Sequence, residues 1–253
     1  MIGLISLLKE IQGKPKAIFM AGPAGSGKSF ISSKLVPTNF QTINVDDTYE
    51  ALLKASGIGM KLAQMTPDEL KKAGELMGQA RKTTDTKYKQ ALEDANNILI
   101  DSVGGSSKTL LKKKQELESL GYETMMVMTY VSPITSLERN KQRDRSLLPS
   151  IVIRSWRDVN KNIDVYKQAF GNNFSLVNLD PENANKEFDE EYIFKTFIEP
   201  LGQVGKDKSP EEKAKSEKEK QQIYSDIKKA LANQPEFDTV EQTKSKINNF
   251  IQK

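Results

Sequence analysis

Residues 17–29 read AIFMAGPAGSGKS, an apolar run that leads directly into a glycine-rich turn. Gly22, Gly27, Lys28 and Ser29 match the spacing G-x-x-x-x-G-K-[ST] of a phosphate-binding loop between a strand and a helix. Glycines let backbone N–H groups close around phosphate oxygens, and the lysine and the positive end of the helix dipole attract the same anion. The stretch therefore predicts a nucleoside triphosphate site, with magnesium bound by the serine hydroxyl. We expect the nucleotide to contact Gly22, Pro23, Ala24, Gly25, Ser26, Gly27, Lys28, Ser29 and Phe30.

Cysteine and histidine are both absent from the 253 residues. Without cysteine there are no disulfides, thiolate zinc sites or cysteine nucleophiles, which is compatible with a reducing cytoplasm. Without histidine, a catalytic base has to be Asp, Glu, Lys or Tyr. The net charge of +4 is spread along the chain, and no apolar stretch approaches the ~20 residues that a membrane span needs. We therefore expect a cytoplasmic protein with no membrane contact.

Five apolar runs have the character of buried strands and alternate with helix-like segments. The runs cover 16–21, 42–45, 97–101, 123–131 and 174–179. Buried parallel strands are apolar on both faces and need crossover connections, which are usually helices. The alternation predicts an α/β fold of the P-loop NTPase type, nucleotide-kinase-like, with a five-stranded parallel sheet, helices on both faces and the phosphate loop after the first strand.

Caps and composition predict the helices and the domain boundary. Thr66 and Ser132 each precede a proline and begin a helix, and Gly121 follows a helix end. From 206 the sequence becomes a charge-dense Lys/Glu run, followed by a sparse apolar pattern that suits two short helices. The chain thus divides into a P-loop domain at 1–205 and a charged linker with a helical tail at 206–253. The expected helices are 28–36, 47–56, 66–80, 84–96, 106–120, 133–143, 149–169 and 187–203.

Acidic residues follow the second and third predicted strands, at the edge where a parallel sheet binds ligands. We interpret Asp47 as the base that takes a proton from an acceptor hydroxyl. Asp46 is expected either to contact substrate and magnesium or to cap the next helix. Asp101 ends the third strand, as a magnesium partner would, and Gly104 either lets a ligand approach closely or only turns the chain.

A cationic segment follows the fourth strand and ends at Pro149. Arg139 and Arg143 are four residues apart and share a helix face, with Arg145 in the following turn. Forked guanidinium groups stabilise the negative charge that spreads over phosphoryl oxygens during transfer. A solvated helix face is the other interpretation. We favour function because small P-loop kinases carry an arginine-bearing lid after this strand.

These stretches together resemble the zeta-toxin-like family of P-loop kinases and, more widely, the small nucleotide and polynucleotide kinases. The resemblance spans about 15–180 and is carried by GPAGSGKS, VDDTYE, DSVGGSS and LERNKQRDR. The turn after the third strand reads SVGG, where the family usually has a G-T-G-like run. The resemblance implies these roles: Lys28 and Ser29 on phosphates and magnesium, Asp47 as base, Arg139 and Arg145 as lid arginines, and Asp101 and, more loosely, Asp85 as acids that contact substrate.

The sequence as a whole predicts an ATP- and Mg²⁺-dependent phosphotransferase that moves the γ-phosphate to a hydroxyl of a small or nucleotide-like acceptor. A kinase of polynucleotides or modified nucleotides, with nucleic acid as partner, is one alternative. An ATP-driven motor or regulatory ATPase is another, although Ser102 stands where many motors place a water-positioning glutamate. A third is a nucleotide-gated module whose C-terminal tail binds a protein partner.

Overall fold

The structure is a computed structural model that describes residues 13–60, 65–143, 147, 149–181 and 234–253, with a few isolated residues between 218 and 232. The expected helix at 187–203, and most of the charged linker, lie outside the described residues. None of the helices in the described part combines the length and the apolar character needed to cross a bilayer.

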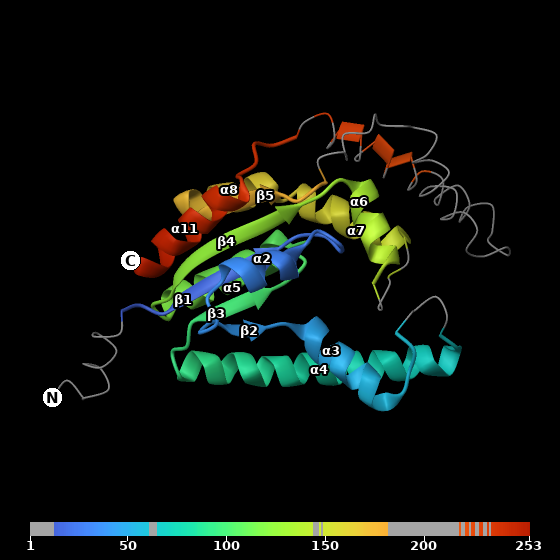
Figure 1. The fold of residues 1–253 in the computed structure, drawn as a ribbon. Coiled ribbons are helices and arrows are strands. Elements are labelled where there is room, and N and C mark those ends of the chain that lie inside the picture. Colours follow the sequence, from blue (N-terminus) through green and yellow to red (C-terminus); the bar gives the residue numbers. More distant parts are fainter. Residues whose placement is uncertain are drawn as a thin grey trace.

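A five-stranded sheet forms the centre of the molecule, in the strand order β2-β3-β1-β4-β5 (Figure 1). Each neighbouring pair is parallel, so the carboxyl ends of the strands meet at one edge. The predicted α/β class and all five predicted strands are confirmed. The strands are β1 (Lys16–Ala21), β2 (Gln41–Ile43), β3 (Ile98–Asp101), β4 (Glu123–Tyr130) and β5 (Phe174–Asn178).

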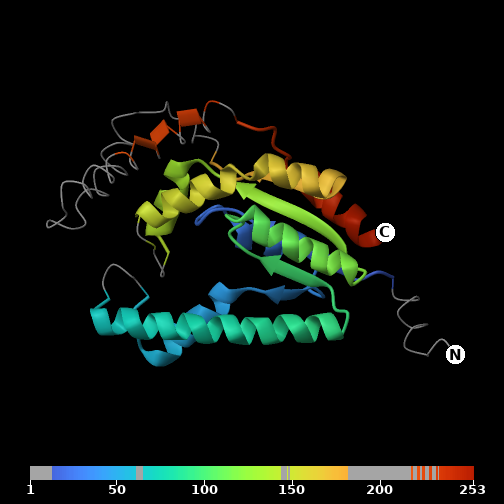
Figure 2. The same cartoon turned by 180° about the vertical axis from the view of Figure 1, so that it is seen from behind.

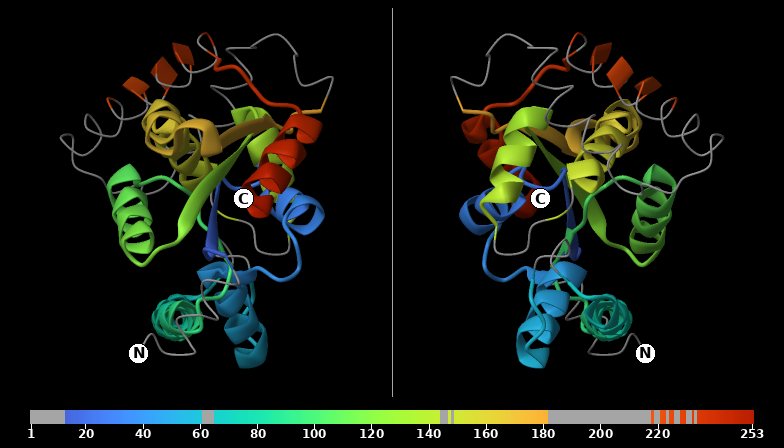
Figure 3. Two further views of the ribbon diagram at one scale, coloured as in Figure 1. Left: turned by 90° about the vertical axis from the view of Figure 1, so that its left-hand side faces the viewer. Right: turned by 90° about the vertical axis from the view of Figure 1, so that its right-hand side faces the viewer.

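Helices cover both faces of the sheet, as the continuous apolar strands require. The end-on views place α2 (Lys28–Leu35) and α11 (Val240–Gln252) on one face, and α5 (Ser107–Ser119) and α8 (Ile163–Phe170) on the other (Figure 3). The view from behind shows α5 in front of the central strands (Figure 2). Alternate residues of β1 divide between the two layers: Ile18 and Met20 pack with α2 and α11, whereas Phe19 packs with α5 and α8.

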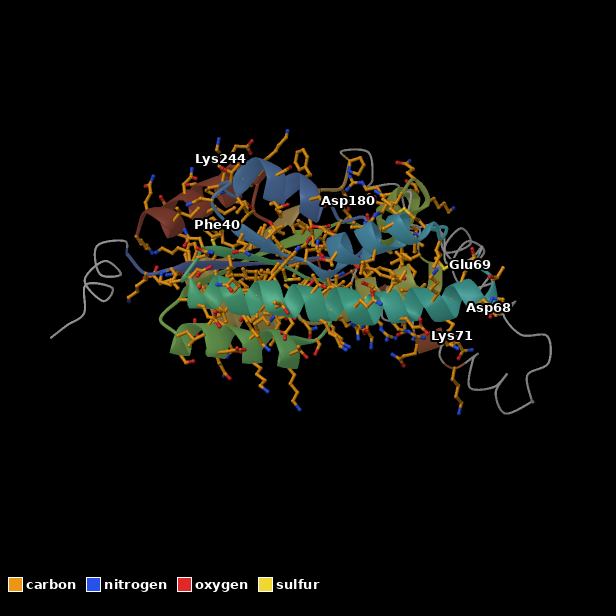
Figure 4. The ribbon with its side chains drawn as sticks, turned by 90° about the horizontal axis from the view of Figure 1, so that it is seen from below. Phe40, Asp68, Glu69, Lys71, Asp180 and Lys244 are labelled. Carbon is orange, nitrogen blue, oxygen red and sulfur yellow. The ribbon has the colours of Figure 1, made fainter. Side chains whose placement is uncertain are left out.

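A helical pair flanks the β2 edge of the sheet and has a small core of its own. It consists of α3 (Val45–Ser56) and α4 (Pro67–Glu93). The start of α4 is a capping box, in which Thr66 and Glu69 bond to each other's backbone N–H (Figure 4). The prediction of two helices at 66–80 and 84–96 is wrong. The helix is continuous because no glycine or proline lies between 80 and 84, where the break was expected, and because its buried face runs on from Ala80 to Thr84.

Two helices follow α6 (Pro133–Lys141) where the sequence predicted one at 149–169. The helix α7 (Pro149–Asn160) ends before α8 begins, because Asn162 Nδ2 donates to the carbonyl oxygens of Asp158 and Gly105 at the turn. The indole of Trp156 donates to Val131 O at 2.7 Å and is fully buried. Core packing, the role expected for this tryptophan, is confirmed.

The end of the chain is part of the domain rather than an appended tail. Asp238 N donates to Leu176 O at 2.7 Å, and Asp238 forms an isolated parallel bridge with Val177 at the β5 edge of the sheet. In α11, Ile247 and Phe250 are buried against β1 and β4. The expectation that all of 206–253 stands apart is therefore corrected for 234–253. The sparse apolar positions of this segment complete one face of the core, which sequence spacing alone did not reveal.

Candidate active site

The glycine-rich turn after β1 needs glycine both for its backbone conformation and because neighbouring elements leave no room for a side chain. Gly25 has φ +75°, and a Cβ there would lie 2.7 Å from Ser136 O of α6. A Cβ on Gly22 would overlap the Thr129 hydroxyl of β4. The turn thus packs directly on two neighbouring elements and ends in α2, whose first residue is Lys28. The strand, loop and helix context that the motif requires is present.

Hydroxyl groups tie this turn to the sheet. Ser26 Oγ and Thr129 Oγ1 are 2.7 Å apart and both side chains are buried. The Thr129 hydroxyl also donates to Ala21 O at 3.4 Å, at the last residue of β1. On α6, the Ser136 hydroxyl donates to Ala24 O. These contacts attach the loop to β4 and to α6, so its shape does not depend on a bound ligand.

The partly buried side chain of Lys28 folds back onto the loop that it follows. Its Nζ donates to Gly22 O at 2.7 Å and to Pro23 O at 3.3 Å. Burial lowers the pKa of this lysine, while the charge of Asp101 and, more weakly, that of Asp46 oppose the shift. An ammonium group that is bonded to neutral carbonyls and is largely desolvated is ready to exchange them for an anion.

A cavity of about 700 Å³ opens at the carboxyl edge of the sheet, directly over the loop. It brings together the phosphate loop, the acids that follow β2 and β3, and the arginines that follow β4. Parallel α/β sheets bind ligands at this edge. The residues singled out from the sequence that line it are Ala24, Gly25, Ser26, Gly27, Lys28, Ser29, Asp46, Asp47, Asp101, Arg139 and Arg143.

The two adjacent aspartates lie in the first turn of α3, which begins one residue before them. Asn44 is the N-cap, and its Oδ1 accepts the N–H of Asp46 at 2.8 Å. The alternative in which Asp46 caps the helix is therefore wrong, because an asparagine already fills that position. Burial raises the pKa of Asp47, and the negative charges of Glu50 and Asp46 add to this, against a hydrogen bond from Asn44 and the charge of Lys87.

Asp101 ends β3 with one carboxylate oxygen bonded and the other unpartnered. Its Oδ2 accepts from Asn44 Nδ2 at 3.0 Å. Its Oδ1 is buried and has no hydrogen-bond partner among the described residues. Burial raises the pKa of this aspartate, and the charge of Lys28 is the largest influence that opposes the shift. An unsatisfied buried acceptor at a ligand-binding edge indicates a partner that arrives with the ligand.

The donors at this edge suit a magnesium ion that is held mainly by its nucleotide. Mg²⁺ takes oxygen ligands and is usually bound by one or two protein groups together with phosphates and water. Ser29 at the start of α2 and the open oxygen of Asp101 are such ligands, and both residues line the cavity. Within the described residues, no group of three or more acids forms a metal site by itself. The residues therefore fit a nucleotide-bound magnesium rather than a protein-caged one.

The arginines differ in how they are placed. Arg139 on α6 donates through Nη1 to Gly25 O at 3.3 Å and through Nη2 to Leu179 O at 2.8 Å, so it joins the phosphate loop to the end of β5. Asp180, the next residue, accepts the N–H of Ser132 at the start of α6 (Figure 4). Arg143 lines the cavity and influences the pKa values of both Lys28 and Asp101. Arg145 lies outside the described residues.

Some residues expected at the site do not line the cavity. Asp85 is 61% exposed on α4 and pairs with Lys89 one turn along at 3.0 Å, so its expected contact with substrate is not supported. The ring of Phe30 is 46% exposed under the Lys34 ammonium. Gly22 and Pro23 lie in the loop without lining the cavity. Sequence spacing placed Asp85 near the third strand but did not show which way its helix faced.

The structure favours the second of the two roles expected for Gly104, a turn of the chain rather than close contact with a ligand. A Cβ at this position would lie 2.6 Å from the Ala21 side chain, and φ is +79°. Its carbonyl accepts from Tyr166 Oη at 2.7 Å. The neighbouring Gly105 is the one that lines the cavity.

Several cavity residues were not identified from the sequence. They come from α3 and its cap and from α7, which forms the wall opposite the aspartates. A helical spacing of four between Arg154 and Asp158 is the signal that was available. The residues are Asn44, Glu50, Arg154, Ser155 and Asp158.

Comparison with known proteins agrees with this geometry. Residues 6–182 match the family model described as zeta toxin. The chain belongs to the zeta toxin family. The fold, the phosphate loop and the family match all indicate a zeta-toxin-like P-loop kinase. The resemblance seen in the sequence is therefore confirmed.

Two solved structures of one complex show the same fold at low sequence identity, and a third structure aligns with a lower score. A complex of AvrRxo1-ORF1 with AvrRxo1-ORF2 aligns over 87% of this chain and 81% of its own, with 13% identity and a TM-score of 0.55. The same complex with ATP gives 14% identity, the same coverage and a TM-score of 0.54. The PezAT toxin-antitoxin system of Streptococcus pneumoniae aligns at 14% identity over 85% and 87% of the two chains, with a TM-score of 0.45. A search of curated proteins finds no match.

Proposed function

We propose that this zeta-toxin-like kinase transfers the γ-phosphate of ATP, with Mg²⁺, to a hydroxyl group of a small or nucleotide-like acceptor. One observation carries the proposal: a single cavity holds the phosphate loop, the α3 aspartates, Asp101 and two arginines. Phosphoryl transfer depends on positioning and on neutralising charge, and these are the groups that it uses. A structure of the same fold in complex with ATP supports the choice of nucleotide.

The loop and Lys28 bind the triphosphate. The ammonium group exchanges its bonds to Gly22 O and Pro23 O for phosphate oxygens, and the N-terminus of α2 points at the same charge. Ser29 and the open oxygen of Asp101 are placed to hold magnesium. The metal, when bound, neutralises charge on the phosphates.

Asp47 is the base for the acceptor hydroxyl. It lies at the start of α3, on the same cavity as Lys28 and Asp101. Burial raises the pKa of its carboxyl, which makes it a better proton acceptor than an exposed aspartate would be. Because the chain has no histidine or cysteine, a direct transfer with a carboxylate base is also the simplest mechanism that its residues allow.

Arg139 and Arg143 stabilise the charge on the transferred group. Arg143 lines the cavity, and its charge lowers the pKa of Lys28, which supports a role for its guanidinium near the phosphates that Lys28 binds. Arg139 holds Gly25 O, and it therefore also keeps the loop in shape. In the sequence, Arg145 was expected to join them, and we retain it as a proposed lid residue.

Transfer to an acceptor is favoured over simple hydrolysis by the end of β3. Ser102 follows Asp101, and its hydroxyl and N–H both donate to Met20 O, at 3.3 and 3.0 Å. A motor ATPase would place a carboxylate there to position water. The cavity instead extends away from the loop toward Arg154, Ser155 and Asp158, which gives space and polar groups for a second substrate.

The test is transfer from γ-labelled ATP to a panel of sugar nucleotides, nucleosides and oligonucleotide 5′ ends. We expect one class to become labelled, and Asp47→Asn to reduce labelling by about 10²–10⁴-fold. Asp85→Asn is the matched control, because Asp85 is exposed and outside the cavity, and it should retain full activity. Release of phosphate without any labelled acceptor would indicate an ATPase instead, and undiminished labelling by Asp47→Asn would contradict the assigned base.

A further inference from the structure

Asn44 makes polar contacts in two directions at the carboxyl edge of the sheet. Its Oδ1 accepts the N–H of Asp46 and caps α3, while its Nδ2 donates to Asp101 Oδ2 at the end of β3. The Asp46 N–H belongs to the first turn of α3, which also carries Asp47. One amide group thus links the strand-end acid to the helix turn that carries the proposed base.

The backbone of Asn44 is held as well. Its carbonyl accepts from Thr48 Oγ1 at 3.4 Å within α3 and from the buried Thr84 Oγ1 at 3.5 Å on α4. The residue lies directly after β2 in an extended conformation and lines the cavity. Its position is therefore set by three elements before it orients anything else.

Capping alone does not account for the residue type. Serine and aspartate cap a helix about as well as asparagine. Aspartate has no donor, and the serine hydroxyl is on a side chain one atom shorter, so it does not reach Asp101 while it caps the helix. The asparagine amide accepts through Oδ1 and donates through Nδ2. The donor faces a carboxylate whose second oxygen is buried and unpartnered, so this bond decides which oxygen of Asp101 stays open.

We infer that Asn44 is a positioning residue for phosphoryl transfer, which aligns Asp101 and Asp47 across the gap between β3 and α3. The inference rests on the proposed function, because it assigns Asn44 an effect on catalysis through those two aspartates. When the amide donor is lost, the Asp101 carboxylate can rotate, and its open oxygen no longer points in one direction. The nucleotide still binds, because the loop and Lys28 are untouched.

The test compares Asn44→Ser with wild type by single-turnover transfer from labelled ATP, with binding of a fluorescent ATP analogue and thermal melting measured in parallel. Serine keeps a capping oxygen, but its side chain is too short to replace the Nδ2 bond to Asp101. We expect the transfer rate to fall about 10- to 100-fold, with the dissociation constant of the analogue and the melting temperature unchanged. Asn96→Ser is the matched control, because Asn96 Nδ2 bonds Gln41 Oε1 across the same two strands at the end away from the cavity. It should retain the wild-type rate.

A second comparison separates positioning from capping. If Asn44 acts through Asp101, then Asn44→Ser slows an Asp101→Asn enzyme much less than it slows wild type. Equal slowing in both backgrounds, or a wild-type rate for Asn44→Ser, overturns the inference while the proposed function stands. Failure of wild type to bind the analogue or to consume ATP overturns the proposed function, and the inference with it.

Discussion

Two lysines at opposite ends of β1, the buried Lys16 and the partly buried Lys28, have different kinds of hydrogen-bond partner. Lys16 opens β1 at the amino edge, and its ammonium group donates to the Glu123 carboxylate and lies 5.3 Å from the centre of the Phe250 ring. Lys28 follows β1 at the carboxyl edge, and its described hydrogen bonds go to the carbonyls of Gly22 and Pro23. One lysine has a charged partner inside the protein, whereas the other is held by neutral groups.

The difference shows where this chain gains stability and where it keeps reactivity. At the amino edge, the hydrogen bond from Lys16 lowers the pKa of Glu123, as expected of a satisfied ion pair. At the carboxyl edge, burial raises the pKa of Asp101 and lowers that of Lys28, and one Asp101 oxygen is unpartnered. Groups with shifted pKa values in a cleft are typical of sites that react or bind.

The largest effect should come from Lys28→Met, which removes the charge at the carboxyl edge. We expect phosphoryl transfer to fall about 10²–10³-fold, because the positive charge next to the phosphates is lost. The melting temperature should not fall, because a partly buried ammonium group that bonds only carbonyl oxygens is replaced by an apolar side chain of similar length. Transfer assays and calorimetry would check both. A clear loss of stability would show that Lys28 is as structural as Lys16.

The next largest effect should come from Phe250→Ala near the amino edge, and it should be a loss of folding stability. Phe250 is a residue of α11 that packs into the core and is 2% exposed, and its truncation should cost about 3–5 kcal/mol of unfolding free energy. Phe30→Ala is the control, since that ring is 46% exposed and its loss should change stability by less than about 0.5 kcal/mol. Urea titration would measure both. Equal, small losses would mean that α11 is not part of the core.

Lys16→Met breaks the ion pair at the amino edge and should cost about 2 kcal/mol of unfolding free energy at pH 7. The pKa of Glu123 is lowered in the fold, so the pair contributes fully above the ordinary glutamate value of 4.5. The contribution disappears as the pH falls below that value through the lower folded pKa. The deficit of the variant should therefore shrink in acid. Lys14→Met is the control, since Lys14 is 71% exposed and lies 4.0 Å from Glu123.

The smallest effect is a shift in the pH dependence of transfer by Glu50→Gln. After burial, Glu50 is the largest cause of the raised pKa of Asp47, so its neutralisation should lower that pKa. The base must be ionised, and the acid limb of the rate profile should move to lower pH by less than about one unit. Lys87→Gln should move it the other way, because the Lys87 charge lowers the same pKa. An unmoved limb in both variants would mean that another group limits the rate.

β1, β3, β4 and β5 were predictable because they are largely buried on both faces and are mainly apolar, whereas the short β2 has an exposed threonine. The helix boundaries were harder to predict from the sequence. The break between α7 and α8 depends on Asn162 reaching Gly105, which is 57 positions away in the sequence. The role of α11 depends on a sheet face that the rest of the chain leaves for Ile247 and Phe250. Contacts of this range have no local sequence signal.

The site was predictable where a motif fixes the backbone. The phosphate loop, Asp47 and Asp101 converge on one cavity as expected, because they follow strands whose carboxyl ends meet. Their chemical roles remain predictions. Asn44 was missed because an asparagine after a strand is usually only a turn residue. Asp85 was misplaced because helix orientation is set by packing between α3 and α4.

The layer that joins Ile18 and Met20 of β1 to Ile247 and Phe250 of α11 has a consequence for synthesis. On the ribosome, the first strand emerges long before the helix that covers it, so an apolar surface stays open while most of the polypeptide is made. We therefore expect a chain cut short before 240 to leave that apolar surface uncovered and to aggregate or be proteolysed more readily than the full chain.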